Sequence, residues 1–185
     1  MRRRYINMSD LKKKYISEVI PKMKEKFGYD NIMAVPKILK VAVNVGTGGV
    51  SKDEKLQEFI AKDLAIITGQ KPVATKAKKA ISAFKIREGM EIGLKVTLRG
   101  KKMFDFVSRL VNVVLPRTRD FRGLSSKSID KGRNLTIGIK EHMIFPEISP
   151  EEIKRNFGME ITIVTNSKSR EEALELFKLM GFPIK

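Results

Sequence analysis

Apolar and polar residues alternate in four short stretches of the chain, a pattern typical of β-strands that bury one face. The stretches begin near Ile38, Ile92, Leu135 and Met159. Their predicted buried faces consist of Leu39, Val41, Val43 and Val45; Ile92, Leu94, Val96 and Leu98; Leu135, Ile137 and Ile139; and Met159, Ile161 and Ile163. Because successive side chains point to opposite faces, we expect the other face of each strand to be polar and accessible.

Apolar residues recur at helical spacing in four other stretches. The first runs from Leu11 to Phe27; Ser9-Asp10 is a helix-start signal before it, and Gly28 ends it. Pro21 lies inside this stretch and predicts a kink or a break. The others run roughly from Lys52 to Thr68, from Met103 to Val114 with Pro116 as its end, and from Ser169 to Met180.

Together these elements predict a two-layer α+β fold. We expect helices on one face of a largely antiparallel sheet, an open opposite face, and long basic loops. A chain of 185 residues favours one domain, 1–185, with residues 1–8 as a flexible N-terminal extension. The open face is predicted to display polar and basic residues and no aromatic side chain: Lys40, Asn44, Lys95, Thr97, Arg99, Thr136 and Lys140.

The net charge of the chain indicates that this fold serves a binding function. The 38 lysines and arginines exceed the 21 acidic residues, so the formal net charge is +17. Enrichment for heat stability would raise both signs together, whereas a one-sided excess favours a polyanionic partner, most commonly nucleic acid. There is no cysteine, which excludes a disulfide framework, a thiol nucleophile and Cys-ligated zinc. Neither a secretory signal nor an apolar membrane-spanning run is evident, so we expect a cytoplasmic protein.

One basic segment stands out. Between Lys71 and Arg87 the chain carries six cations and no acid, in a connection of about 20 residues that is longer than usual. Such a segment is often a solvated loop, but apolar residues such as Ile81 and Phe84 are interleaved with the cations. We therefore expect a partly ordered projection that touches a phosphate backbone.

Other candidate sites are weaker. The glycines of residues 46–49 follow a strand and precede a helix, as in a phosphate-binding turn, but the full glycine pattern fails, and a turn that needs positive φ is the simpler interpretation. His142, the only histidine, is expected to be a surface or loop residue without a catalytic or metal role. The segment Arg117–Gly123 is either an RNA contact, a protein-docking patch or a plain exposed loop.

The polar sheet face also indicates how RNA would be bound. Sheets that bind single strands stack bases on aromatic side chains, and the predicted open face has none. Its hydrogen-bonding and cationic residues suit phosphates, 2′-hydroxyls and the minor groove of a folded RNA instead.

Several blocks, in order, resemble one known family. They are residues 35–46 (VPKILKVAVNVG), 69–79 (GQKPVATKAKK), 84–89 (FKIREG), 92–100 (IGLKVTLRG), 115–123 (LPRTRDFRG), 137–141 (IGIKE), 145–148 (FPEI) and 159–165 (MEITIVT). From about Leu11 to the C-terminus the chain is similar to bacterial large-subunit ribosomal protein number five. It departs from the family's Gly-Arg-Gly-Asn turn, because residues 131–134 read Lys-Gly-Arg-Asn, and the Arg2–Arg4 extension lies outside the match.

The resemblance implies a non-enzymatic ribosomal protein that binds 5S ribosomal RNA in the central protuberance through its sheet face. The matching positions are Asn44, Gln70, Thr97 and Arg99, to which the predicted face adds Lys40 and Lys95. It also implies that the basic loop contacts P-site transfer RNA through Lys76, Lys78, Lys79, Lys85 and Arg87, and that a small-subunit head protein is contacted, for which Arg117, Arg119 and Arg122 are the candidates. Large-subunit rRNA and neighbouring ribosomal proteins are further expected partners, and we expect a monomer when free, with no metal or cofactor.

Two alternatives remain open from the residues alone. A free-standing RNA-binding chaperone would bind many RNAs with little preference. A metal-dependent nuclease would need converging carboxylates, which the predicted cationic face does not offer.

Overall fold

The computed structural model describes residues 10–50, 53–119, 121–149, 151 and 153–185. The predictions that concern Arg2–Arg4, the 1–8 extension, Ser9, Lys52 and Asp120 therefore lie outside the described residues. Helices and strands elsewhere follow the predicted order. The helices are α1 (Asp10–Lys14), α2 (Ile20–Phe27), α3 (Glu54–Thr68), α4 (Gly100–Arg109), α5 (Leu115–Arg117) and α6 (Arg170–Leu179).

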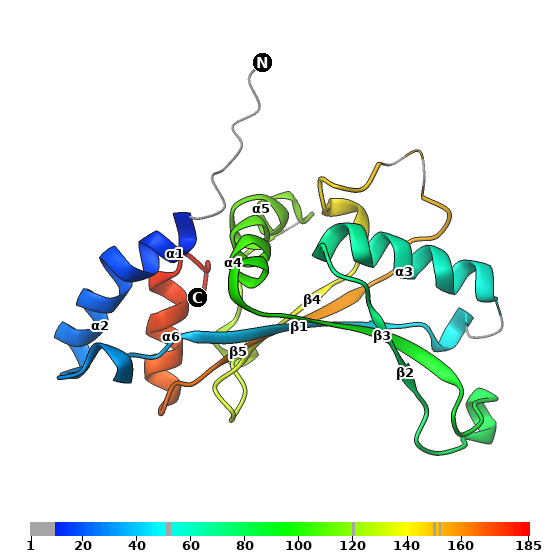
Figure 1. Ribbon diagram of the computed structural model, residues 1–185, viewed down its shortest axis with the longest axis horizontal. Coiled ribbons are helices and arrows are strands. Elements are labelled where there is room, and N and C mark those ends of the chain that lie inside the picture. The colour runs from blue at the N-terminus through cyan, green and yellow to red at the C-terminus, as the bar shows by residue number, and fades with distance from the viewer. Residues whose placement is uncertain (1–9, 51–52, 120, 150, 152) are drawn as a thin grey trace. The chain divides into compact units, whose positions relative to one another are not determined.

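The architecture is α+β around one open, largely antiparallel sheet, as predicted (Figure 1). Its strands are β1 (Ile38–Gly46), β2 (Val73–Lys76), β3 (Glu91–Leu98), β4 (Leu135–Ile139) and β5 (Met159–Thr165), in the order β2-β3-β1-β5-β4. β2 was not predicted; it pairs antiparallel with β3. The predicted buried face of β1 is wrong at Leu39, which is 41% exposed, because Ile38 turns inward and the alternation resumes only at Val41.

Contacts divide the chain into two compact units. The first comprises residues 1–41, 99–136 and 163–185, and the second comprises residues 42–98 and 137–162. That the whole chain folds as one domain stays a prediction.

In the first unit, each of two prolines follows a widened helical turn. A π-helical turn, Tyr15–Val19, separates α1 from α2, and the Ile20 N–H bonds back to the Tyr15 carbonyl. A second π-turn, Leu110–Val114, separates α4 from α5 in the same way. In both cases the proline is the second residue after the π-turn, and it cannot donate a helical hydrogen bond. The helical conformation continues through Pro21, so the predicted break is wrong, while the alternative of a kink stays a prediction. Pro116 lies inside the last turn rather than ending it, which corrects that expectation.

Arg133 explains a departure from the family pattern. It lies in the turn before β4 with φ of 66°, a left-handed conformation that favours glycine, and the resemblance described above implies a glycine at this position. Three contacts hold it there: its Nη1 donates to the Lys168 carbonyl at 2.9 Å, its own carbonyl accepts from Thr165 Oγ1 at 2.8 Å, and the adjacent Asn134 N–H donates to Asp130 Oδ1 at 2.8 Å. These hydrogen bonds stabilise the turn despite the backbone conformation.

The second unit is built on α3 and the strand segments it covers. Asp53 caps the helix by accepting from the Leu56 N–H at 3.1 Å, and Gly69 ends it with φ of 67°. Ile60, Leu64 and Ile67 form its buried stripe and α3 packs on β3, whose Val96 and Leu98 are buried. This packing leaves Lys95 exposed and Thr97 half-buried on the alternate positions of β3.

Candidate nucleic-acid interface

The basic segment between Lys71 and Met90 is an ordered β-hairpin, referred to below as the basic hairpin, and not an irregular loop. β2 pairs with the first half of β3, from Val73 opposite Lys95 to Lys76 opposite Glu91. Beyond the strands, the Ala77 N–H donates to the Met90 carbonyl at 2.8 Å, and Ile81 and Ile86 exchange two backbone hydrogen bonds. Hydrogen bonds thus join the two arms of the hairpin at intervals between the end of the strands and the tip.

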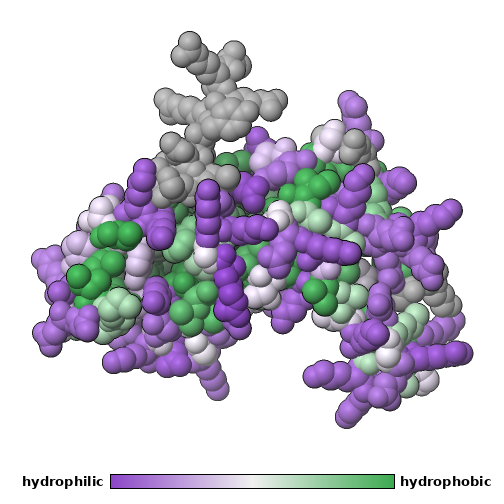
Figure 2. Space-filling view, in the orientation of Figure 1, coloured by the Kyte–Doolittle hydropathy of each residue, from purple (hydrophilic) through white to green (hydrophobic). Residues whose placement is uncertain are grey.

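Every cation predicted to contact transfer RNA lies on this hairpin and is exposed: Lys76, Lys78, Lys79, Lys85 and Arg87. Figure 2 shows hydrophilic side chains projecting from the hairpin at the lower right of the view. Charges of one sign on a narrow projection add their potentials, and counterions screen them over about 10 Å at ordinary ionic strength. The hairpin is therefore suited to attract a phosphate backbone without reading its sequence.

Lys85 closes the turn at the tip in an unusual conformation. The turn Ser82–Phe84 is a single 3₁₀ turn, and Lys85 after it has φ of 55°, in the left-handed region. A residue with a β-carbon costs about 1–2 kcal/mol there relative to the right-handed region. Glycine would remove that cost but also the positive charge, so the residue combines a strained backbone with an exposed cation.

The predicted sheet-face residues of the second unit are Asn44, Lys95, Thr97 and Gln70. Asn44 and Thr97 are half-buried on neighbouring strands, whereas Lys95 and Gln70 are exposed. The Gln70 side-chain amide donates to the Thr97 carbonyl at 3.3 Å, which brings the start of the basic hairpin to the end of β3. Thr68 fixes the segment further, since its buried hydroxyl lies 2.7 Å from the Leu64 carbonyl and 3.0 Å from that of Gln70.

Lys40 and Arg99 belong to the first unit by the contact division: Lys40 lies on β1 two residues before the second unit begins, and Arg99 directly follows β3. Lys40 is half-buried and Arg99 is exposed. None of the six predicted 5S-binding side chains is therefore packed in the core.

The three candidate bridge arginines are exposed in the first unit: Arg117 is the last residue of α5, and Arg119 and Arg122 follow it. The segment that follows them is more structured than a plain loop. Leu124 is buried and pairs with Ile184 near the C-terminus, and Ile129 is buried beside its bridge partner Leu135. The arginines thus project from a backbone that is anchored shortly after them.

The glycine turn after β1 is not a phosphate site. Gly46, Gly48 and Gly49 do not have positive φ, which also corrects the simpler expectation for this turn. The Thr47 N–H donates to the Ile92 carbonyl at 2.9 Å, and Asp53 places a carboxylate at the N-terminus of α3. That carboxylate already accepts from one amide that a phosphate would use and places a negative charge at the helix start, so the turn serves to connect strand and helix.

His142 lies in a short turn between β4 and β5 and is buried, so the expectation of a surface or loop residue is right about the loop and wrong about the surface. Its ring stacks on Phe157 at 3.9 Å between centroids, Nδ1 lies 3.1 Å from Asn156 Oδ1, and Nε2 lies 3.5 Å from Asp63 Oδ2 on α3. Burial lowers the pKa of His142, while the Asn156 hydrogen bond and the Asp63 charge oppose that shift. The ring is a neutral structural contact within the second unit, which sequence spacing could not reveal because Asp63 and His142 lie far apart in the chain.

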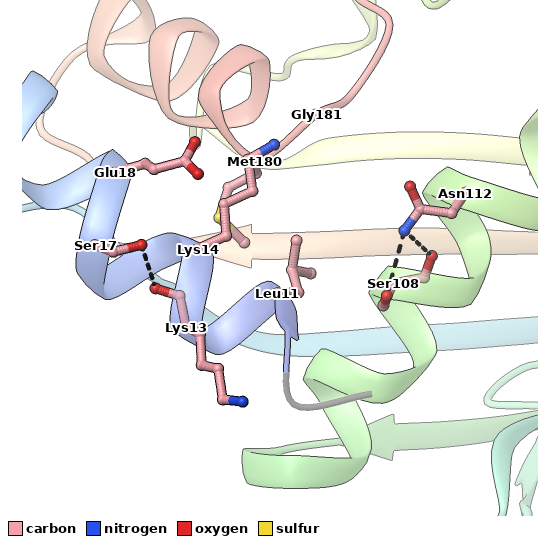
Figure 3. A pocket seen from close by; sticks show the side chains of 9 residues that line it. All are labelled: Leu11, Lys13, Lys14, Ser17, Glu18, Ser108, Asn112, Met180 and Gly181. Atoms are coloured by element: carbon pink, nitrogen blue, oxygen red, sulfur yellow. Dashed lines mark hydrogen bonds between the residues drawn. The ribbon is translucent and has the colours of Figure 1, made fainter. Parts of the chain in front are cut away.

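A pocket in the first unit offers no converging chemistry among the residues that line it. This pocket has a volume of about 380 Å³ and lies among α1, the following π-turn, α4 with its own π-turn, and the end of α6 (Figure 3). Its polar groups bond locally: the Asn112 amide donates to the Ser108 carbonyl at 2.9 Å, and the Ser17 hydroxyl donates to the Lys13 carbonyl at 3.0 Å. Among the described residues, no group of three or more His, Cys, Asp or Glu side chains is arranged to hold a metal ion. No helix among the residues that the structure describes is long and apolar enough to cross a bilayer.

Known ribosomal proteins match most of the chain, which agrees with the exposed cations described above. The family model described as "Ribosomal protein L5" matches residues 31–87, and the model of the C-terminal part of the same ribosomal protein family matches residues 91–184. The chain is 56% identical over 176 residues to the large ribosomal subunit protein uL5 of Halothermothrix orenii, covering 95% of this chain and 98% of that protein. It is 56% identical to that of Desulforamulus reducens, with 95% and 97% covered, and 51% identical to that of Syntrophomonas wolfei, with 96% and 100% covered.

These matches extend over nearly the whole chain, and the relatives are non-enzymatic constituents of the bacterial ribosome, which works in the cytoplasm. The chain belongs to the uL5 family of large-subunit ribosomal proteins.

Proposed function

We propose that this ribosomal protein binds 5S ribosomal RNA through the accessible polar face of its sheet. The observation that carries the proposal is the state of six side chains: Lys40, Asn44, Gln70, Lys95, Thr97 and Arg99 are all exposed or half-buried. Half-buried Asn and Thr on adjacent strands have few rotamers to lose and can hydrogen-bond 2′-hydroxyls and base edges in a shallow minor groove. The flanking cations add phosphate contacts.

The same proposal extends to transfer RNA. The basic hairpin carries Lys76, Lys78, Lys79, Lys85 and Arg87 on a hydrogen-bonded scaffold, and we assign it the contact with P-site transfer RNA. Exposed cations that are not held by burial suit a ligand that must be released at each round of translation, because their attraction depends on charge and not on shape.

A third part of the proposal concerns the small subunit. Arg117, Arg119 and Arg122 are exposed in the first unit on a segment whose continuation is buried at Leu124. Arginine forms bidentate hydrogen bonds with carboxylates, so this segment fits an acidic surface of a protein in the small-subunit head.

A titration of 5S ribosomal RNA against the full chain tests the sheet-face assignment. We expect Arg99→Ala to weaken binding by about 1–3 kcal/mol, the usual effect of losing a hydrogen bond to a charged group. Arg155→Ala is the matched control, since Arg155 is an exposed arginine outside the proposed face, and it should change affinity by less than about 0.5 kcal/mol. Equal affinities for wild type and Arg99→Ala, measured by filter binding, would remove Arg99 from the interface.

A further inference from the structure

The tip of the basic hairpin leaves apolar side chains in contact with water. Ala77 is buried and Ile86 is half-buried, but Phe84 is 72% exposed and Ile81 is 46% exposed. Packing within the hairpin therefore does not account for Phe84 and Ile81. Their exposure has an unfavourable hydration free energy, and such a cluster on a functional projection marks a contact surface.

Phe84 is distinctive among the aromatic residues of the chain. Of the phenylalanines and tyrosines within the described residues, it is the only one classed as exposed, and the rest are buried or half-buried. The sheet face itself offers no aromatic side chain for stacking. If the protein stacks an aromatic ring on RNA through its described residues, the hairpin tip is the place that presents one.

The local backbone fixes where this ring lies. Ile81 and Ile86 are joined by two hydrogen bonds of 2.9 and 3.1 Å, and Ser82–Phe84 form the single turn between them. The Lys85 N–H closes that turn on the Ser82 carbonyl at 3.0 Å, with Lys85 itself in the left-handed conformation. A ring held on a closed turn of this kind has less freedom to lose on binding than a ring on an open loop.

The charge around the tip selects the class of partner. Six cations and no acid lie between Lys71 and Arg87, so a polyanion is attracted and an acid-poor protein surface is not. Among polyanions, only nucleic acids also present flat apolar faces, because an unstacked base or the end of a base-paired stack exposes its ring system. Phe84 thus suits the flat base faces of a nucleic acid, and the cations suit its phosphates.

We propose that Phe84, with Ile81 in the same turn, stacks on an exposed nucleobase or base-pair face of the folded RNA that the hairpin cations attract. This inference rests on the proposed function of the hairpin and adds to it a contact that does not depend on ionic strength. The cations bring the phosphate backbone to the hairpin, and the ring then fixes the position of the RNA along it. The site is thereby specific for RNA that exposes a base face, and not for any charged duplex.

Tryptophan substitution at this position provides a direct probe, because the chain contains no tryptophan. Phe84→Trp in the full chain is titrated with a transfer RNA transcript, and stacking on a base is expected to quench its fluorescence saturably. Met33→Trp is the control, since Met33 has nearly the same exposure, 73%, but lies in the first unit away from the hairpin sequence. Its fluorescence should not change at the same RNA concentrations.

A second readout separates stacking from charge. Phe84→Ala and Phe84→Leu should each weaken transfer RNA binding by roughly 5- to 100-fold, the range for loss of one base–aromatic stack, with the salt dependence unchanged. Phe84→Tyr keeps the ring and should bind like the wild type. If Phe84→Leu binds as tightly as the wild type, the contact is merely apolar and the stacking proposal is overturned.

The remaining outcomes distinguish this inference from the proposal on which it rests. If Phe84→Trp is not quenched while Lys78→Ala still weakens binding, transfer RNA binds the hairpin without stacking, and only the inference fails. If neither Phe84 nor the hairpin cations affect transfer RNA binding, the assignment of the hairpin fails as well. Quenching of Phe84→Trp by an isolated protein of the small-subunit head, and not by RNA, would likewise overturn the inference in favour of a protein partner.

Discussion

Two surfaces of the second unit present polar groups in opposite ways. On the basic hairpin, Lys78, Lys79 and Arg87 stand free in water on a two-stranded projection. On the sheet, Asn44 and Thr97 are half-buried and supported by neighbouring strands and by α3 beneath the layer. The hairpin therefore presents a high density of charge but little surface that could fit one particular partner. The sheet face presents a lower density of charge on a surface of fixed shape.

The difference shows how one small unit can separate attraction from recognition. Exposed cations contribute affinity that falls with salt and is indifferent to sequence. Half-buried hydrogen-bonding groups contribute less at long range, but they leave an unpaired polar atom when the wrong surface is offered, which penalises the wrong partner. The following predictions test whether this division holds.

The largest effect is expected where the hairpin joins the sheet. Gly93 faces Thr75 across β2 and β3, and a β-carbon on it would lie 2.7 Å from Thr75 Oγ1 and 3.1 Å from the Val45 carbonyl. Gly93→Val should lower the free energy of unfolding by about 3 kcal/mol, because neither strand can move away without breaking the ladder. Urea unfolding monitored by circular dichroism measures this loss.

Gly138→Val is the matched control, since Gly138 is also a strand glycine but a β-carbon on it would meet no other atom within 4 Å. Its stability should equal or exceed that of the wild type, because valine favours strands. If Gly93→Val were as stable as Gly138→Val, the result would contradict the close packing of the hairpin against the sheet at Gly93.

The sequence predicted the sheet better than the hairpin. Alternation identified β4 and β5 because each buries one face over its whole length. It also identified β3, where Val96 and Leu98 are buried as predicted but Ile92 and Leu94 are only half-buried. β2 was missed because only Val73 and Thr75 suggest a strand in four residues flanked by Pro72 and lysines, and its pairing with β3 satisfies the backbone without a buried face. The outward positions Asn44 and Thr97 followed from alternation, whereas Gln70 was placed only by the family resemblance and the hydrogen bond to Thr97 could not be foreseen.

Long-range packing explains the other differences. No local pattern reports that His142 is covered by Phe157 and faces Asp63, since these contacts form only when the second unit folds. Likewise, the helix rules that predict a kink or a break at Pro21 do not anticipate the π-turn that precedes it.

A smaller effect than that of Gly93 is expected from the hairpin cations. Replacing Lys78 and Lys79 together by Ala should reduce the slope of log K against log salt for transfer RNA by about 1.4–1.8, as two phosphate contacts are lost. The slope for 5S ribosomal RNA should change by less than half of that. Binding isotherms at four or more salt concentrations measure both slopes, and equal reductions for the two RNAs would contradict the division between hairpin and sheet.

The smallest effect concerns the backbone of Lys85. Lys85→Gly relieves the left-handed strain and Lys85→Ala retains it, while both remove the charge. We expect the glycine variant to be more stable than the alanine variant by about 1 kcal/mol, and the two to bind transfer RNA equally. Thermal unfolding and RNA titration of both variants test this pair; greater stability of the alanine variant would show that the turn changes conformation.

The most direct test of the account removes the hairpin tip and keeps the sheet. The Ala77–Met90 hydrogen bond marks a point at which residues 78–89 can be replaced by an Asn-Gly turn. We predict that this variant binds 5S ribosomal RNA within about threefold of the wild type, while its affinity for transfer RNA falls by at least about 100-fold, as four cations and the exposed ring are lost. Parallel loss of affinity for both RNAs would contradict the account, because recognition by the sheet face would then depend on the hairpin.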